Sequence, residues 1–298
     1  MMPLTRVGRD TGTLTTAEVN YIRSQVIKAA WPNLVGRTLM PTKNLGSMGY
    51  MKETYYTETD MGQATISMFG EEKSEDKVAL TEHTVNIPII SKDFRLNGRD
   101  IEAARLGNRD LNTQFAENAA RQCAEEEDKL ILTGEYSGWP ALGIEGLASA
   151  TGRNTMAGTA WITNYITIVA AAKAMLEADG HFGPKKLIIP SAWSAYLDAL
   201  VANTAILKRT VIENLLGGPS SIVVSESLFA PADGVQDTML LVDTSPDNFE
   251  LVVAEDYRTV GPDRQPGEDI YKGKVRVVVA PMIYRPTAVC EVTNLTAA

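Results

Sequence analysis

The sequence predicts an α+β fold, in which helices and strands are mixed without the regular strand–helix–strand alternation of an α/β protein. Two observations carry this prediction. Residues 111–132 have the apolar spacing of one long amphipathic helix, whereas several short apolar segments between residues 221 and 292 are typical of buried strands. With 298 residues, 44% of them hydrophobic, the chain is long enough to bury a substantial core.

The N-terminal region begins with a polar, glycine-containing stretch, residues 1–13, which predicts a mobile arm. A helix capped by Thr15 or Thr16 follows, because apolar residues then recur at helical spacing, and Pro32 ends it. The next apolar segment, residues 35–40, is predicted to form a short strand.

Residues 44–82 form the most unusual part of the sequence. They contain strand-forming residues but few strongly apolar ones, and residues 71–77 are a run of charges. A segment of this length and composition cannot bury a core of its own. We therefore predict a long extended hairpin that packs against something else, which in an oligomer is another subunit.

The remaining elements are predicted from the same periodicities. A glycine- and proline-rich connection at 134–146 indicates a domain boundary. Helices are expected at residues 100–106, 164–178, 192–202 and 204–216, and strands at 84–90, 186–189, 221–225, 238–242, 249–254, 274–279 and 283–292.

The charge balance argues against a protein whose main task is to grip nucleic acid. The chain has 28 basic and 37 acidic residues, a net charge of -9, although its first fifty residues are basic. This basic arm is explained equally by a polyanion facing it and by simple solvation. No apolar run is long enough for a membrane span, and no secretory signal is visible. Two distant cysteines exclude a disulfide scaffold.

No catalytic or cofactor motif stands out. The two histidines, His83 and His181, lack a second histidine or cysteine at ligand spacing, and no nucleophile elbow, phosphate loop or dinucleotide fingerprint is present. The acidic run 125–128 has two interpretations, a metal or acid–base site and a solvated or interface-facing helix surface. The second is favoured because four consecutive helical residues point around the helix. We expect a protein that is not an enzyme and holds no cofactor or metal.

Three stretches resemble a known family. They are LTTAEVNYIRSQVIKAAWPNLVGRTLMPT, then VNIPIISKDFRLNGRDIEAARLGNRDLNTQFAENAARQCAEEEDKLILTGE, then GIEGLAS. They are similar to shell proteins with the Hong Kong 97-type capsid fold, which occurs in the major capsid proteins of tailed phages and in encapsulin nanocompartments. The resemblance is specific over roughly half of the chain.

The resemblance implies four parts for this chain. They are an N-terminal arm and helix at residues 1–43, an extended loop at 44–82, a peripheral domain with a spine helix at 83–140 and 266–298, and an axial domain at 141–265.

The same resemblance implies two functional surfaces. The N-terminal arm, with Arg6 and Arg9, would face the lumen of a shell. The extended loop, with Tyr55, Tyr56, Ile66 and Phe69, would lie over a neighbouring subunit.

Two functions remain open at this point. The expectation is a major capsid protein that self-assembles, through pentamers with or without hexamers, into an icosahedral virion enclosing double-stranded DNA without sequence-specific binding. Assembly would take place in the host cytoplasm, without a membrane, and scaffold, portal or decoration proteins would be its further partners. The alternative is an encapsulin shell protein that encloses a cargo enzyme.

Overall fold

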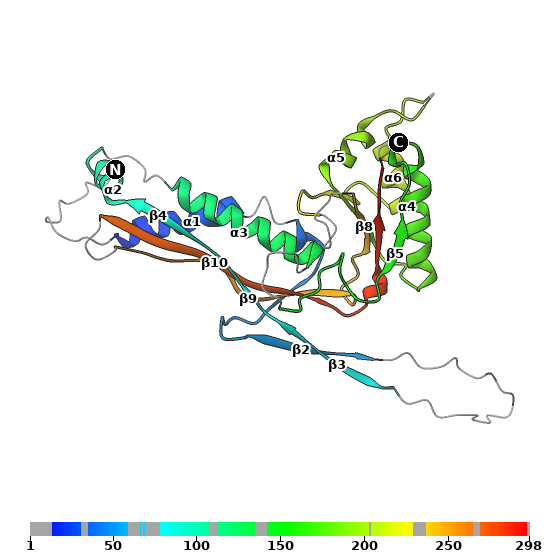
Figure 1. The fold of residues 1–298 in the computed structure, drawn as a ribbon, viewed down its shortest axis with the longest axis horizontal. Coiled ribbons are helices and arrows are strands. Elements are labelled where there is room, and N and C mark those ends of the chain that lie inside the picture. The colour runs from blue at the N-terminus through cyan, green and yellow to red at the C-terminus, as the bar shows by residue number, and fades with distance from the viewer. Residues whose placement is uncertain are drawn as a thin grey trace.

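The computed structural model describes residues 14–30, 35–58, 66, 68, 78–107, 113–134, 142–202, 204–228, 237–264 and 269–296. Within these ranges the chain is an elongated molecule with two lobes, each built on its own sheet, and a hairpin that projects from between them (Figure 1). The mixture of helices with separate sheets of four, five and two strands confirms the α+β class.

A four-stranded sheet forms the first lobe. The long strands β9 (Phe249–Arg264) and β10 (Ile270–Ile283) are antiparallel neighbours at its centre. Strand β4 (Ile89–Asn97) pairs with β10 along its whole length, and β1 (Thr42–Asn44) pairs with β9 in parallel at the opposite edge. In the described part of the chain, β4 therefore has a strand on one side only.

Two long helices, α1 (Thr16–Ala30) and α3 (Gln114–Thr133), cover one face of this sheet (Figure 1). The start of α1 is fixed by a reciprocal cap, because the Glu18 N–H donates to Thr15 Oγ1 (3.3 Å) and the Thr15 N–H donates to Glu18 Oε2 (2.8 Å). The helix α2 (Gly98–Gly107) directly follows β4. It is tied to the start of α1 by the Arg105–Glu18 ion pair at 2.8 Å.

The opposite face of the same sheet carries the root of the hairpin. Strands β2 (Lys52–Glu58) and β3 (Leu80–Asn86) are antiparallel, and β3 continues into β4 after a break at Ile87 and Pro88. Exposed and half-buried residues alternate along β2, as expected when only one face of a strand has something to pack against.

A five-stranded sheet forms the second lobe, in the order β5, β11, β8, β6, β7. Its apolar face packs against α4 and α6 around the fully buried Trp161. The bounds of these elements are β5 (Asn154–Ala157), α4 (Trp161–Ala178), β6 (Lys185–Ile189), α5 (Ser191–Ser194), α6 (Lys208–Leu216), β7 (Ile222–Val224), β8 (Met239–Asp243) and β11 (Val289–Thr293). The other face of this sheet shares a core with the first lobe, where Ile131 and Leu132 of α3 meet Leu240 and Val289. None of the described helices is long and apolar enough to span a bilayer.

The structure differs from the predicted elements at several places. Strand β5 was not predicted, and β9 continues ten residues past the predicted end at residue 254. Residues 36–38 form a 3-10 turn, not a strand, because the N–H groups of this segment bind a carboxylate instead of a neighbouring strand. The predicted helix 192–202 ends early, and Leu200 pairs instead with Leu207. Strand β10 continues through Pro281, so that the last two strands divide after Ile283.

The two sheets also divide the chain differently from the expected domain ranges. Strand β9 belongs to the four-stranded sheet, although it falls in the range 141–265 expected for the axial domain. Strand β11 belongs to the five-stranded sheet, although it falls in the range 266–298 expected for the peripheral domain. Strand pairing between segments far apart in sequence explains both differences.

Candidate functional site

Two carboxylates are buried where the N-terminal segment crosses the C-terminal half of α3. Glu127 is 0% exposed and Asp128 is 3% exposed. Both lie on the part of α3 that is covered by the turn at residues 36–38 and by β9. Burying two adjacent acids is unfavourable unless each finds partners, so their partners identify what this site holds together.

Glu127 binds both the N-terminal segment and the sheet. Arg37 grips its carboxylate with two nitrogens, Nε at 2.6 Å from Oε1 and Nη2 at 3.3 Å from Oε2. The Tyr257 hydroxyl on β9 donates to Oε2 at 2.7 Å, and the Arg37 guanidinium lies 5.3 Å from the centre of the Tyr257 ring. Burial, followed by the adjacent carboxylate, raises the pKa of Tyr257 and keeps its proton available for this bond. A forked guanidinium suits such a bidentate contact better than a lysine would.

Asp128 binds backbone instead of side chains. Its two oxygens accept from the N–H groups of Val35 (3.0 Å) and Gly36 (2.9 Å). Burial raises the pKa of Asp128 to about 7, against the effect of these two N–H groups, which lower it. Gly36 is needed here, because a Cβ at this position would lie 2.8 Å from Cδ1 of Ile131.

These contacts correct the expectation that the acidic run 125–128 is a solvated or interface-facing surface. Glu126 fits that expectation, since it is half-exposed and pairs with Lys129 at 2.7 Å, but Glu127 and Asp128 are buried anchors. Among the described residues, no group of three or more His, Cys, Asp or Glu side chains is placed to hold a metal ion. One signal was available in the sequence, because Glu127 follows Cys123 by one helical turn and so continues the buried stripe of α3.

The root of the hairpin is fixed by Tyr55. Its hydroxyl donates to the carbonyl oxygen of Ile283 at 3.1 Å, and its ring meets Tyr284 edge-on at 5.1 Å. On its other side the ring stacks on His83 of β3 at 5.1 Å, and the His83 Nε2 lies 2.9 Å from Thr57 Oγ1. Burial raises the pKa of Tyr55. The second histidine, His181, is buried, and its Nε2 lies 2.9 Å from Thr287 Oγ1.

Of the residues predicted to contact a neighbouring subunit, one packs within its own chain and two others are exposed. Tyr55 faces its own chain, whereas the adjacent Tyr56 is 58% exposed on the opposite face of β2, and Ile66 is fully exposed. Phe69 lies outside the described residues, as do Arg6 and Arg9 of the predicted lumenal arm.

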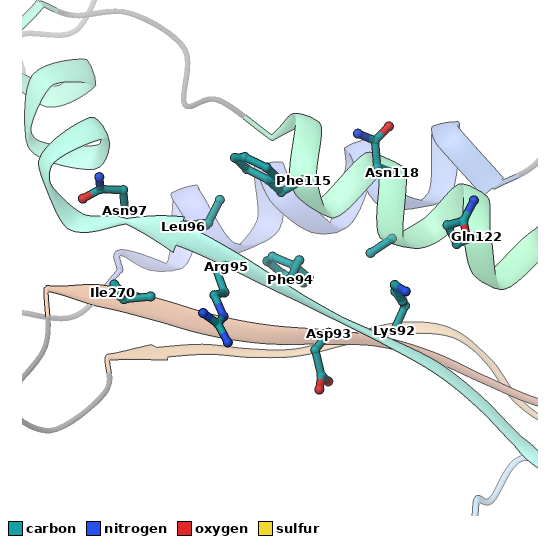
Figure 2. A pocket seen from close by; sticks show the side chains of 11 residues that line it. Lys92, Asp93, Phe94, Arg95, Leu96, Asn97, Phe115, Asn118, Gln122 and Ile270 are labelled. Carbon is teal, nitrogen blue, oxygen red and sulfur yellow. The ribbon is translucent and has the colours of Figure 1, made fainter.

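A groove runs beside the free edge of the four-stranded sheet, between β4 and the first half of α3 (Figure 2). Its volume is about 620 Å³. Apolar side chains contributed by both elements line it, and the exposed ring of Phe115 stands at its rim. Lys92 points from β4 toward α3, whereas Asp93 and Arg95 point to the other side of the strand (Figure 2).

The two-lobed body, the spine helix α3 and the projecting hairpin define the class of fold to which the chain belongs, the Hong Kong 97-type fold. The crystal structure of a virus-like particle from Pyrococcus furiosus is similar, with a TM-score of 0.68 and 16% identity over 92% of this chain and 98% of that one. The capsid of Myoviridae phage XM1 has a TM-score of 0.61 and 12% identity, over 99% of both chains. At such identities the likeness shows the fold alone.

Sequence comparison identifies the family within this class. A family model described as "Encapsulating protein for peroxidase" matches residues 5–261. The type 1 encapsulin shell protein EncA of Myxococcus xanthus is 30% identical over 253 residues, which cover 84% of each chain. The chain belongs to the encapsulin family of shell proteins.

This family assignment corrects the expected function. The matches in sequence are to encapsulin shells, whereas the phage capsids are similar in fold only. The expectation of a viral capsid enclosing DNA was wrong, and the virion location, the packaged DNA and the phage partners have no support. The alternative, an encapsulin shell protein, is the supported one.

Proposed function

We propose that this chain is the structural subunit of a closed protein compartment that encloses a cargo enzyme, and that it is not itself an enzyme. The family match across residues 5–261 carries the proposal. The exposed hairpin supports it, because side chains such as Tyr56 and Leu80 remain in solvent in the single chain, and exposed apolar surface of this kind is typical of a surface that packs against another protein.

In the proposed shell, the lobe built on the four-stranded sheet is the peripheral domain and the lobe built on the five-stranded sheet is the axial domain. Subunits meet around symmetry axes in pentamers, with hexamers if the shell is large. The face covered by α1 and α3 lines the lumen, together with the arm that carries Arg6 and Arg9. The hairpin, with Tyr56, Ile66 and Phe69, lies over a neighbouring subunit.

The proposed cargo is a peroxidase or another redox enzyme, captured at the lumenal surface near α1. The description of the family supports this class of cargo. Arg37, Glu127 and Asp128 would then hold the wall to which cargo binds, because they fix the segment that follows α1 to α3. Assembly and loading would take place in the cytoplasm of the producing cell.

The proposal is tested by size-exclusion chromatography and negative-stain microscopy of the purified full chain. We expect uniform, closed particles of megadalton mass. Mass spectrometry of particles purified from the native cell should then find one abundant redox enzyme inside. A monodisperse monomer or dimer at micromolar concentration would contradict the shell, and particles filled with DNA would contradict the cargo.

A further inference from the structure

We propose that the turn at residues 179–184 is a brace between the two lobes of the subunit, and that protonation of His181 releases one side of it. With the ring neutral, the brace holds the second lobe against the connections that lead to the first. In acid the second lobe becomes freer to move. The inference goes beyond the proposed function, because it concerns contacts within a single chain.

Two of the connections between the lobes lie next to this turn. One, residues 244–248, leads from β8 into β9, and the other, residues 284–288, leads from β10 into β11 at the base of the second lobe (Figure 1). The N–H groups of Tyr284 and Arg285 donate to the carbonyl oxygen of Asn248 at 2.9 and 3.2 Å, so the two connections are tied to each other. Because both carry the chain from one sheet to the other, movement of one lobe against the other bends them.

The turn belongs to the second lobe, since it joins α4 to β6, and it binds the first connection through backbone groups. The Gly183 N–H donates to Oδ2 of the buried Asp243 at 2.8 Å. The Thr244 N–H donates to the carbonyl oxygen of Pro184 at 2.9 Å. These bonds contain no group that changes its charge near neutral pH.

The second connection is bound through a histidine. The ring of His181 is in a residue only 7% exposed, and its Nε2 lies 2.9 Å from Thr287 Oγ1. The carbonyl oxygen of Thr287 accepts from Asn154 Nδ2 at 3.0 Å, so two side chains of the second lobe hold this residue. One of the two contacts therefore depends on the protonation of an imidazole.

The surroundings of His181 favour the neutral ring. Four charged groups face it: Asp243 at the end of β8, Asp179 and Lys185 on either side of the turn, and Arg285 in the second connection. Two are acidic and two are basic, so they oppose one another and offset little of the cost of burying a charge. Burial is the largest effect, and the pKa of His181 lies below its ordinary value.

Protonation weakens the contact for two reasons. It makes both ring nitrogens donors, so that Nε2 of His181 no longer accepts the proton of the Thr287 hydroxyl. It also places a positive charge in a site shielded from water. Because the folded chain favours the neutral ring, the contribution of His181 to stability is fully present above the ordinary histidine pKa and is lost as pH falls through the lower pKa of the folded chain.

Hydrogen exchange of the full chain, followed by mass spectrometry, tests the brace. After correction for the intrinsic effect of pH, amides at residues 284–290 should exchange about three-fold faster at pH 5 than at pH 8. His181→Gln keeps a neutral polar group opposite Thr287 and should remove this difference. The matched control, His83→Gln at the hairpin root, should retain it. Amides at residues 251–259, within β9, should be equally protected at both pH values.

Three results would overturn the proposal. They are equal exchange at both pH values in the native chain, an undiminished pH dependence in His181→Gln, and an equal acceleration at residues 251–259, which would show that the whole chain loosens in acid. Shell formation is no part of this measurement. A chain that exchanges as expected but forms no shells would contradict the proposed function and leave the brace standing.

A second variant tests the other partner of the contact. Thr287→Val removes the hydroxyl and nearly keeps the shape of the side chain. Amides at residues 284–290 should then exchange at pH 8 about as fast as those of the native chain at pH 5, with little further change in acid. A pH dependence as large as that of the native chain would contradict the pairing of His181 with Thr287.

Discussion

The N-terminal segment and the hairpin are both attached to the four-stranded sheet, but on opposite faces and in opposite ways. On the helical face, Arg37 and Tyr257 bind Glu127, and the backbone of the turn at residues 36–38 binds Asp128, all within one chain. On the other face, Tyr55 fixes the root of the hairpin while Tyr56 stays in solvent. The first attachment is complete in one subunit, whereas the second, in the proposed shell, is half of a contact between subunits. Substitutions on the helical face should therefore affect the stability of the chain, and substitutions along the hairpin should affect assembly.

Glu127→Ala should have the largest effect. It removes the carboxylate that Arg37 and Tyr257 share and leaves a largely buried guanidinium with its exposed partner Asp256 only, which should cost about 3 kcal/mol of unfolding free energy. Differential scanning calorimetry should show a clear drop in Tm. The matched control, Glu126→Ala, loses one half-exposed ion pair with Lys129 and should cost less than about 1 kcal/mol. Similar losses in both variants would show that Glu127 is no anchor.

Tyr55→Ala and Tyr56→Ala compare the two faces of one strand. Tyr55→Ala removes the ring packed against Tyr284 and should destabilise the subunit by about 2 kcal/mol. Tyr56→Ala should change the stability of the isolated subunit by less than about 0.5 kcal/mol, because more than half of its side chain already lies in solvent there. It should nevertheless lower the denaturant concentration at which shells dissociate, as measured by light scattering. If Tyr55→Ala instead weakened the shell and left the subunit stable, Tyr55 and not Tyr56 would lie at the contact between subunits.

A further effect should appear as a pH dependence of the stability. The pKa of Asp128 in the folded chain is about 7, above its ordinary value, so its contribution to stability is fully present below about pH 4 and is lost as pH rises through 7. We expect the unfolding free energy of the native chain to fall by at least about 1 kcal/mol over this range relative to that of Asp128→Asn. Denaturant unfolding at several pH values measures the difference. If the unfolding free energies of the native chain and of Asp128→Asn changed in parallel with pH, Asp128 would already be ionised near pH 4.

The sequence was a good guide wherever one segment's own pattern decides its structure. The long helix α3 and the buried strand β8 were predicted within a few residues, because apolar periodicity is local. The turn at residues 36–38 was not, because its N–H groups are satisfied by Asp128, far away in the chain. The composition of the run 125–128 does not reveal that Glu127 and Asp128 are buried, because their partners lie far away in the chain, on β9 and in the N-terminal segment.

The choice between a viral capsid and an encapsulin was also beyond the local pattern. Both kinds of shell share one fold, so neither helix periodicity nor a basic N-terminus separates them. The difference is carried by similarity spread over most of the chain, at 30% identity to an encapsulin shell, and not by any single motif.

The continuity of β3 with β4 has a mechanical consequence. A hairpin held by a neighbour transmits tension along the covalent backbone past Pro88 into β4, which pairs with β10 from Ile89 to Asn97. Because that tension runs parallel to the strands, the hydrogen bonds between β4 and β10 are loaded together in shear and do not open one after another. Internal pressure on the proposed shell would thus pull against the most extensively paired sheet of the subunit.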